Sequence, residues 1–157
     1  MTTIAENRIS FLKQVGSSVR SDEVARFAAA LDDFVAWSDA TSGSVFFSER
    51  DYDQKTVSFE ERTSRRVFWT AYPRRESGAK FEILPGGADC LSPEARGKAL
   101  DILKSISREP IHDNSKLRVP FTALKGAGSR DKVKLLLTTL LVELNDQAGE
   151  GSSSNAG

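Results

Sequence analysis

The spacing of apolar residues changes from a helical to a strand-like period near residue 43, and this change constrains the fold most. Before it, Val24, Phe27, Leu31 and Phe34 recur at the spacing of a helix that turns one face to a core. After it, short segments alternate between apolar and polar positions, as strands with one buried face do. The chain therefore predicts an α+β fold in which helices cover one face of an antiparallel sheet.

The order of these patterns predicts the order of the elements. We expect an N-terminal helical hairpin, an antiparallel meander of three to four strands, then a helix, an edge strand and a C-terminal helix. Pro120 favours the edge position for the last strand, because proline has no amide to donate to a neighbour. The expected ranges are 3–20 and 21–37 for the hairpin, whose second helix is ended by SDATSG (38–43), then 43–49, 55–61, 65–72 and 79–87 for the meander, and 91–106, 116–121 and 130–146 for the last three elements.

The helix over 91–106 and the last helix both carry start signals. Ser92 is a good N-cap, Pro93 suits the first helical position, and Glu94 places negative charge in the first turn. Ser129 is the expected cap of the last helix. We expect one domain over residues 1–148, because 157 residues are enough for a substantial core. The small polar residues of 149–157 predict a disordered tail.

Composition and the lack of long apolar segments favour one cellular compartment over others. Cys90 is the one cysteine, so an intrachain disulfide is impossible, which fits a reducing compartment. The N-terminus lacks the continuous apolar core of a signal peptide, and no apolar run approaches the ~20 residues of a membrane span. We expect a cytoplasmic protein with no membrane partner.

The net charge of zero conceals segregated charges. Residues 1–61 hold six Lys/Arg and eleven Asp/Glu, a balance of −5, whereas residues 62–80 hold six Lys/Arg and one Glu, a balance of +5. Such a basic segment can create a strong local field in a neutral protein. The alternative is that the acidic helices fold back and neutralise it.

The basic segment contains the stretch RRVFWTAYPRR, residues 65–75, in which paired arginines flank three aromatic residues. Alternation puts Trp69 on one face of a strand and Phe68 and Tyr72 on the other. Aromatic rings on an open sheet face can stack bases at ~1–3 kcal/mol each, while arginines bind phosphates. The sequence thus predicts a non-catalytic module that contacts single-stranded nucleic acid. The candidate residues are Arg66, Phe68, Tyr72, Arg74, Arg75 and Lys80.

A plainer interpretation of the same stretch stays open. Phe68 and Tyr72 could be core residues of a strand buried on both faces, with the arginines at its solvated ends. No hallmark of a known RNA- or DNA-binding module accompanies the stretch: there is no GXXG loop and no zinc-ligand spacing.

A protein-interaction or inhibitor module is the alternative function. The acidic N-terminal helices, with Asp32 and Asp33, could dock a partner or mimic nucleic acid. The last helix is apolar over more than one stripe, so Leu137 and Leu141 lie either in the core or in a seam with a partner or a second copy.

The sequence offers little support for catalysis. Cys90 and His112 could form a nucleophile–base pair, but the residues around Cys90 match no such site. Asp51, Glu60, Lys80 and Glu82 could be assembled into a nuclease-like set, but their spacing fits no motif. We expect no catalytic activity, no metal and no cofactor.

Overall fold

The computed structural model describes residues 4–16, 21–41, 43–50, 54–73, 79–85, 90–107 and 116–156. Within these ranges the chain forms helices and strands in the order that the sequence predicts. The elements are α1 (Ile4–Gly16), α2 (Ser21–Ala40), β1 (Gly43–Arg50), β2 (Gln54–Glu61), β3 (Val67–Tyr72), β4 (Lys80–Ile83), α3 (Pro93–Ile106), β5 (Leu117–Pro120), the 3-10 helix η3 (Phe121–Leu124) and α4 (Ala127–Ala156).

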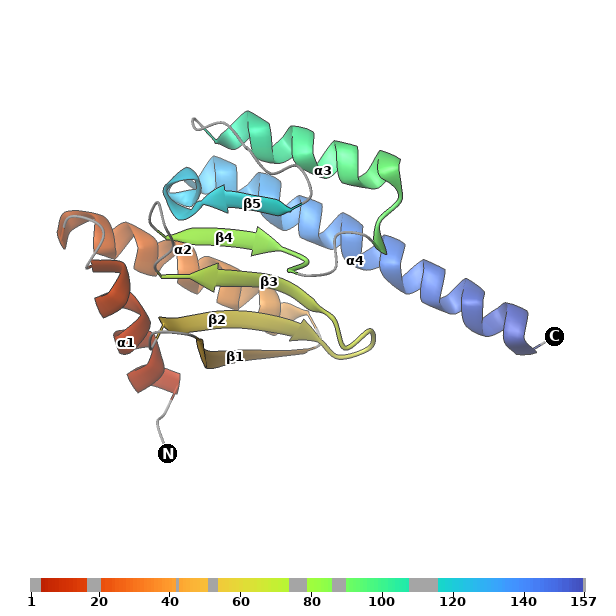
Figure 1. Cartoon of the computed structure of the whole chain (residues 1–157), viewed down its shortest axis with the longest axis horizontal. Helices are drawn as coiled ribbons and strands as arrows, with labels where there is room; N and C mark the ends of the chain where they lie inside the picture. The colour runs from red at the N-terminus through yellow and green to blue at the C-terminus, as the bar shows by residue number, and fades with distance from the viewer. Residues whose placement is uncertain are drawn as a thin grey trace.

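The five strands form one antiparallel sheet in the order β1-β2-β3-β4-β5 (Figure 1). The first four are a meander, because strands that follow one another in the chain pair with each other. β5 joins β4 after α3 and forms an edge of the sheet, where Pro120 costs no ladder hydrogen bond. The α+β prediction, with its meander and its edge strand, is confirmed.

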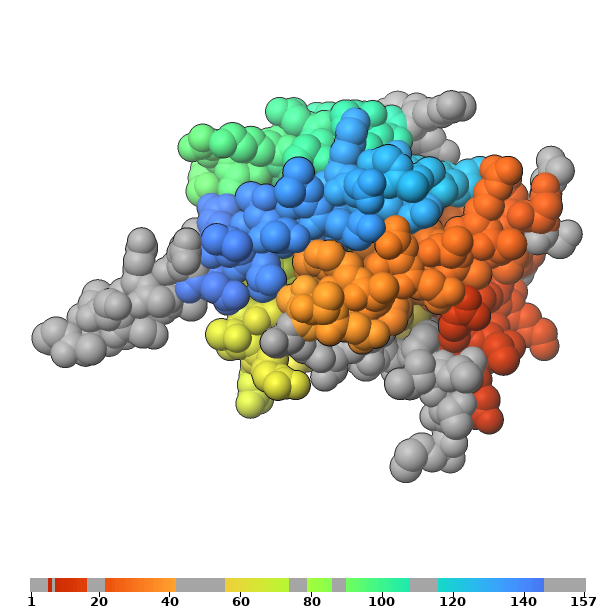
Figure 2. Space-filling model, turned by 180° about the vertical axis from the view of Figure 1, so that it is seen from behind, coloured from red at the N-terminus to blue at the C-terminus, as the bar shows by residue number. Residues whose placement is uncertain are grey.

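Helices α2 and α4 cover one face of the sheet. They lie behind it in Figure 1, and Figure 2, which views the molecule from behind, shows them side by side. The indole Nε1 of Trp37 on α2 donates to Thr138 Oγ1 on α4 at 3.2 Å and joins the two helices. α1 packs against α2 and β2, and α3 packs against α4 and β5.

Aromatic rings form the centre of the core between the sheet and α2. Phe34 stacks on Phe81 with ring centroids 4.5 Å apart, and Trp69 stacks on Phe81 at 5.6 Å. The Trp69 Nε1 donates to Ser38 Oγ at 2.9 Å, so the buried indole N–H is satisfied. Since Trp69, Ala71 and Phe81 share this side, the core face predicted from alternation is confirmed.

α3 starts where the sequence predicts, whereas α4 starts earlier than predicted. Ser92 caps α3, and its Oγ accepts from the Ala95 amide at 3.1 Å, with Pro93 at the first position. α4 begins at Ala127 instead of residue 130, so the expectation that Ser129 is its cap was wrong by three residues, nearly one helical turn. The helix continues through Ala156, and the disordered tail over 149–157 stays a prediction.

Candidate nucleic-acid interface

The sheet face opposite α2 and α4 carries a row of polar residues across four strands. Ser58 on β2, Thr70 on β3, Glu82 on β4 and Arg118 on β5 are partners in register. The hydroxyls of Ser58 and Thr70 share a hydrogen bond of 2.7 Å. Three members are nearly inaccessible, with exposed fractions of 4% for Ser58, 1% for Thr70 and 4% for Glu82. We call these four residues the polar row.

Glu82 is the charged centre of the polar row. Its Oε1 accepts from the Tyr72 hydroxyl at 3.2 Å and from Arg118 Nη2 at 3.0 Å and Nε at 3.3 Å. The Arg118 guanidinium also lies 5.8 Å from the centroid of the Tyr72 ring, within cation–π range. Tyr72 is therefore engaged at its hydroxyl by Glu82 and at its ring by Arg118.

The aromatic residues of the predicted interface are buried. Phe68 is 0% exposed and Tyr72 is 3% exposed, so neither ring offers a surface on which a base could stack. The expectation that they lie on an open face is corrected. A bulge contributes to this outcome, because Phe59 pairs with Trp69 and Glu60 with Val67, which leaves Phe68 without a partner on β2. Simple alternation therefore does not assign the face of Phe68.

The cationic residues of the predicted interface are separated from one another. Arg66 is exposed just before β3 begins, whereas Lys80 is half-buried and pairs with Tyr72, at the other end of that strand. Arg74 and Arg75 lie outside the described residues. Of the predicted site, Arg66 is thus the arginine that the structure places on the surface.

The turn between β2 and β3 is tight and is organised by Glu61. The Arg65 amide donates to the Glu61 carbonyl at 2.9 Å, and the Glu61 amide donates to the Arg66 carbonyl at 2.9 Å. Glu61 Oε2 accepts from both the amide and the hydroxyl of Ser64, at 2.6 and 2.7 Å. Arg65 closes the turn in the left-handed region, with φ 57°.

The Glu61 carboxylate is directed into the turn rather than toward the arginines. Glu61 as a whole residue is only 3% exposed. Burial by itself would raise the pKa of Glu61, but the hydrogen bonds from Ser64 and Thr63 outweigh it and lower the pKa. The charge of Glu61 is thus held inside the turn by its own neighbours.

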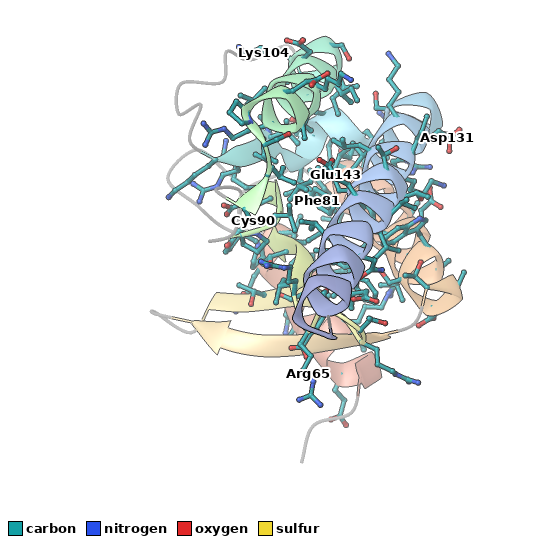
Figure 3. The ribbon with its side chains drawn as sticks, turned by 90° about the vertical axis from the view of Figure 1, so that its right-hand side faces the viewer. Arg65, Phe81, Cys90, Lys104, Asp131 and Glu143 are labelled. Atoms are coloured by element: carbon teal, nitrogen blue, oxygen red, sulfur yellow. The ribbon has the colours of Figure 1, made fainter. Side chains whose placement is uncertain are left out.

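Three arginines project from this turn. Arg62, Arg65 and Arg66 are all exposed, and none has a carboxylate partner among the described residues. Figure 3 shows Arg65 at one extremity of the molecule, far from Lys104 at the other. We call Arg62, Arg65 and Arg66 the arginine turn. Sequence reasoning selected Arg66 but missed Arg62 and Arg65 as site residues, although both lie in the basic segment.

The acidic residues of the alternative interface are paired within the chain. Arg8 of α1 binds Asp32 through two hydrogen bonds, Nε to Oδ1 at 2.9 Å and Nη2 to Oδ2 at 2.7 Å. Asp33 accepts from Arg130 Nε at 2.8 Å and from Lys134 Nζ at 2.9 Å, both on α4. The charges that were expected to recruit a partner therefore hold α1, α2 and α4 together.

The leucines of the alternative interface belong to the core side of α4. Leu137 is 0% exposed, and Leu141 is half-buried against the same core. Leu135 and Val142 are the large apolar side chains of this helix on its outer surface, with exposed fractions of 68% and 56%. The core interpretation of Leu137 follows from its burial.

The described residues offer no metal site and no membrane span. Within these ranges, no group of three or more His, Cys, Asp or Glu side chains could hold a metal ion. None of the helices there has the length and apolar composition needed to cross a bilayer. Cys90 is half-buried with a free thiol, and His112, its possible partner, lies outside the described residues.

Comparison of the chain with protein-family models, with curated proteins and with solved structures finds no match.

Proposed function

We propose that the chain is a non-catalytic module that binds the phosphate backbone of nucleic acid through the arginine turn. The single observation that supports this proposal is the placement of Arg62, Arg65 and Arg66 on one tight turn, exposed and without a carboxylate partner in the described part of the chain. Guanidinium groups bind phosphate oxygens in pairs of parallel hydrogen bonds. Three such groups on one turn form a compact polyanion contact.

The organisation of the turn favours binding in a second way. The Glu61 carboxylate caps Ser64 and fixes the backbone from which the arginines project. A backbone that is ordered before binding loses less conformational entropy when a ligand arrives. The arginine side chains alone must then be ordered by the phosphates.

The proposal differs from a stacking platform in what it predicts about ligands. Because Phe68 and Tyr72 are buried, affinity comes from charge, and both single strands and duplexes bind with little dependence on base sequence. Three phosphate contacts correspond to a slope of about −2 for log K against log salt concentration with a single strand.

The test is fluorescence anisotropy with labelled single-stranded and duplex oligonucleotides, between about 50 and 200 mM salt. The variant Arg62→Gln/Arg66→Gln removes two exposed charges and should make the single-strand slope shallower by about 1.4. The matched control, Lys104→Gln/Lys132→Gln, removes two exposed charges from α3 and α4 and should bind like the wild type. Absence of wild-type binding at low salt, or an unchanged slope in the arginine variant, would overturn the proposal.

Docking of a protein partner is the second candidate function. It is supported by the outer surface of α4, where Leu135 and Val142 are exposed. Light scattering of the wild type and of Leu135→Ser tests it. A wild-type assembly that dissociates in the variant supports this function, whereas a monomeric wild type excludes docking of a second copy of the chain.

The proposed location is the cytoplasm. Cys90 as the one cysteine supports it, because a free thiol is stable in a reducing compartment.

A further inference from the structure

A cleft opens where α2, α3, η3 and α4 meet, beyond the Pro120 end of β5. Its volume is about 510 Å³. In Figure 1 this region and the β2–β3 turn lie at opposite ends of the sheet. The cleft is therefore separate from the arginine turn.

The side chains that line the cleft are cationic and hydroxylated. Arg26 of α2 and Lys125 contribute the charges, and Ser107, Thr122 and Ser129 contribute hydroxyls. Among the residues that the structure describes, no aspartate or glutamate lines the cleft. Guanidinium, ammonium and hydroxyl groups are the donors that proteins use for phosphate. This donor set selects an anion.

The two cations differ in how far their charge is compensated. Lys125 Nζ lies 2.7 Å from Glu23 Oε2, so part of its charge is already neutralised. Arg26 is exposed and has no carboxylate partner among the described residues. Within the described part of the chain, Arg26 is thus the lining cation without a carboxylate partner, and a ligand anion would be its counterion.

The wall of the cleft is fixed by Arg130. Its Nη1 donates to the carbonyls of Leu124 and Lys125, at 3.1 and 2.7 Å, while its Nε donates to Asp33 at 2.8 Å. The backbone that carries Thr122, Lys125 and Ser129 is therefore tied to α2. A preformed wall reduces the entropy that a small ligand must offset on binding.

The size of the cleft excludes a bare inorganic anion as its complete occupant. A volume of about 510 Å³ lies within the ~300–1,000 Å³ of small-molecule sites. Ile106 and Ala123 add apolar surface beside the polar groups. We propose that the cleft binds a small phosphorylated molecule, with its phosphate on Arg26, Lys125 and Ser129 and its organic part against the apolar wall.

Isothermal titration calorimetry with matched probes tests the proposal. The probes are inorganic phosphate, adenosine 5′-monophosphate and glucose 6-phosphate, with adenosine and glucose as their unphosphorylated counterparts. We expect saturable binding of at least one phosphorylated probe, weaker binding of inorganic phosphate, and no binding of adenosine or glucose. Absence of saturable binding by both adenosine 5′-monophosphate and glucose 6-phosphate would overturn the proposal.

Variants locate the bound phosphate. Arg26→Gln should lower the affinity about tenfold or more, because it removes a charge-assisted hydrogen bond, while its thermal unfolding should match that of the wild type. Arg62→Gln/Arg66→Gln should bind the probe unchanged. If Arg26→Gln binds normally and the arginine-turn variant does not, the anion belongs to the arginine turn and the cleft proposal is wrong. Failure of oligonucleotide binding has no bearing on this site.

Discussion

Glu82 on β4 and Arg118 on β5 lie opposite each other, and their carboxylate and guanidinium are joined at 3.0 Å on the sheet face away from α2 and α4. The side chain of Glu82 is 5% exposed and that of Arg118 is 24% exposed. A carboxylate at such depth is tolerated because its donors are supplied by neighbouring strands. The pair therefore links the edge strand to the sheet through side chains as well as through the backbone.

Removing the cation from this pair should destabilise the fold. Arg118→Met removes two of the three hydrogen bonds that Glu82 Oε1 accepts and leaves the one from the Tyr72 hydroxyl. The Glu82 carboxylate then stays buried without its cation. We expect a loss of about 2–3 kcal/mol in the free energy of unfolding, less than the ~3–5 kcal/mol of a fully buried pair, because Arg118 is partly exposed. Urea denaturation measures it. The double variant Glu82→Gln/Arg118→Met should recover part of the loss in stability. If its effect equals the sum of the effects of Glu82→Gln and Arg118→Met, the two groups do not interact.

Phe68 should behave as a core residue. Phe68→Ala removes a side chain that is 0% exposed and should cost ~3–5 kcal/mol of stability, whereas Phe68→Leu should cost less, since it leaves a smaller cavity. Both are measured by denaturant unfolding. Stability close to the wild type in Phe68→Ala would mean that this ring is on the surface and would restore the stacking hypothesis.

Arg65 allows binding to be separated from stability. Its φ of 57° is strained for a side chain with a Cβ but free for glycine. Arg65→Gly should keep or raise the stability, by up to ~1 kcal/mol, while it weakens oligonucleotide binding at low salt. Thermal unfolding and anisotropy on the same sample measure the two effects. Undiminished oligonucleotide binding by Arg65→Gly would exclude this arginine from the contact.

Asp33 should contribute to the acid sensitivity of the fold. Burial alone would raise its pKa, but hydrogen bonds from Arg130 and Lys134 outweigh it, so the folded pKa lies below the unfolded value of about 4. A lowered folded pKa means that the contribution is present above about pH 4 and is lost as the pH falls through the folded value.

Asp33→Asn should therefore show a weaker decline in stability than the wild type as the pH falls below about 4. Urea midpoints measured from neutral pH downward compare the two proteins. Parallel curves for Asp33→Asn and the wild type would show that Asp33 gains no proton-linked stability from α4.

Leu135 and Leu137 form a matched pair on α4. Leu137→Ala should cost ~2–5 kcal/mol, because the side chain is 0% exposed, whereas Leu135→Ala should change stability by less than ~0.5 kcal/mol, because it is 68% exposed. Denaturant unfolding at two protein concentrations measures the stability change of each variant. A large, concentration-dependent effect of Leu135→Ala would instead indicate that this surface is buried between copies.

The sequence predicts the elements well where one face of each is apolar and the ends carry clear signals. The cap at Ser92 and the alternation through Phe81 and Ile83 are local patterns, and the structure has both. The bulge at Phe68 has no comparable signal, since an extra residue in a strand leaves the composition unchanged. Alternation therefore gave the wrong environment for that ring.

The candidate site was less predictable because its contacts join distant parts of the chain. Arg118 and Glu82 are separated by 36 residues, and Arg130 and Asp33 by 97, so no spacing rule links them. The predicted use of Asp32 and Asp33 as a docking surface did not account for such partners. The arginine turn was partly visible as a basic segment, but the inward capping role of Glu61 depends on a turn geometry that composition does not reveal.

The strand order also has a consequence for how the chain folds. Each strand from β2 to β4 pairs with its immediate predecessor, so the chain closes only short loops, at low entropic cost, to form the meander. β5 reaches its place beside β4 only after the whole of α3 has been traversed. The meander can thus assemble as an early unit, and the edge strand docks when α3 and α4 are in position. Amide protons of β5 should accordingly exchange with solvent before those of β3, which is flanked by strands on both sides.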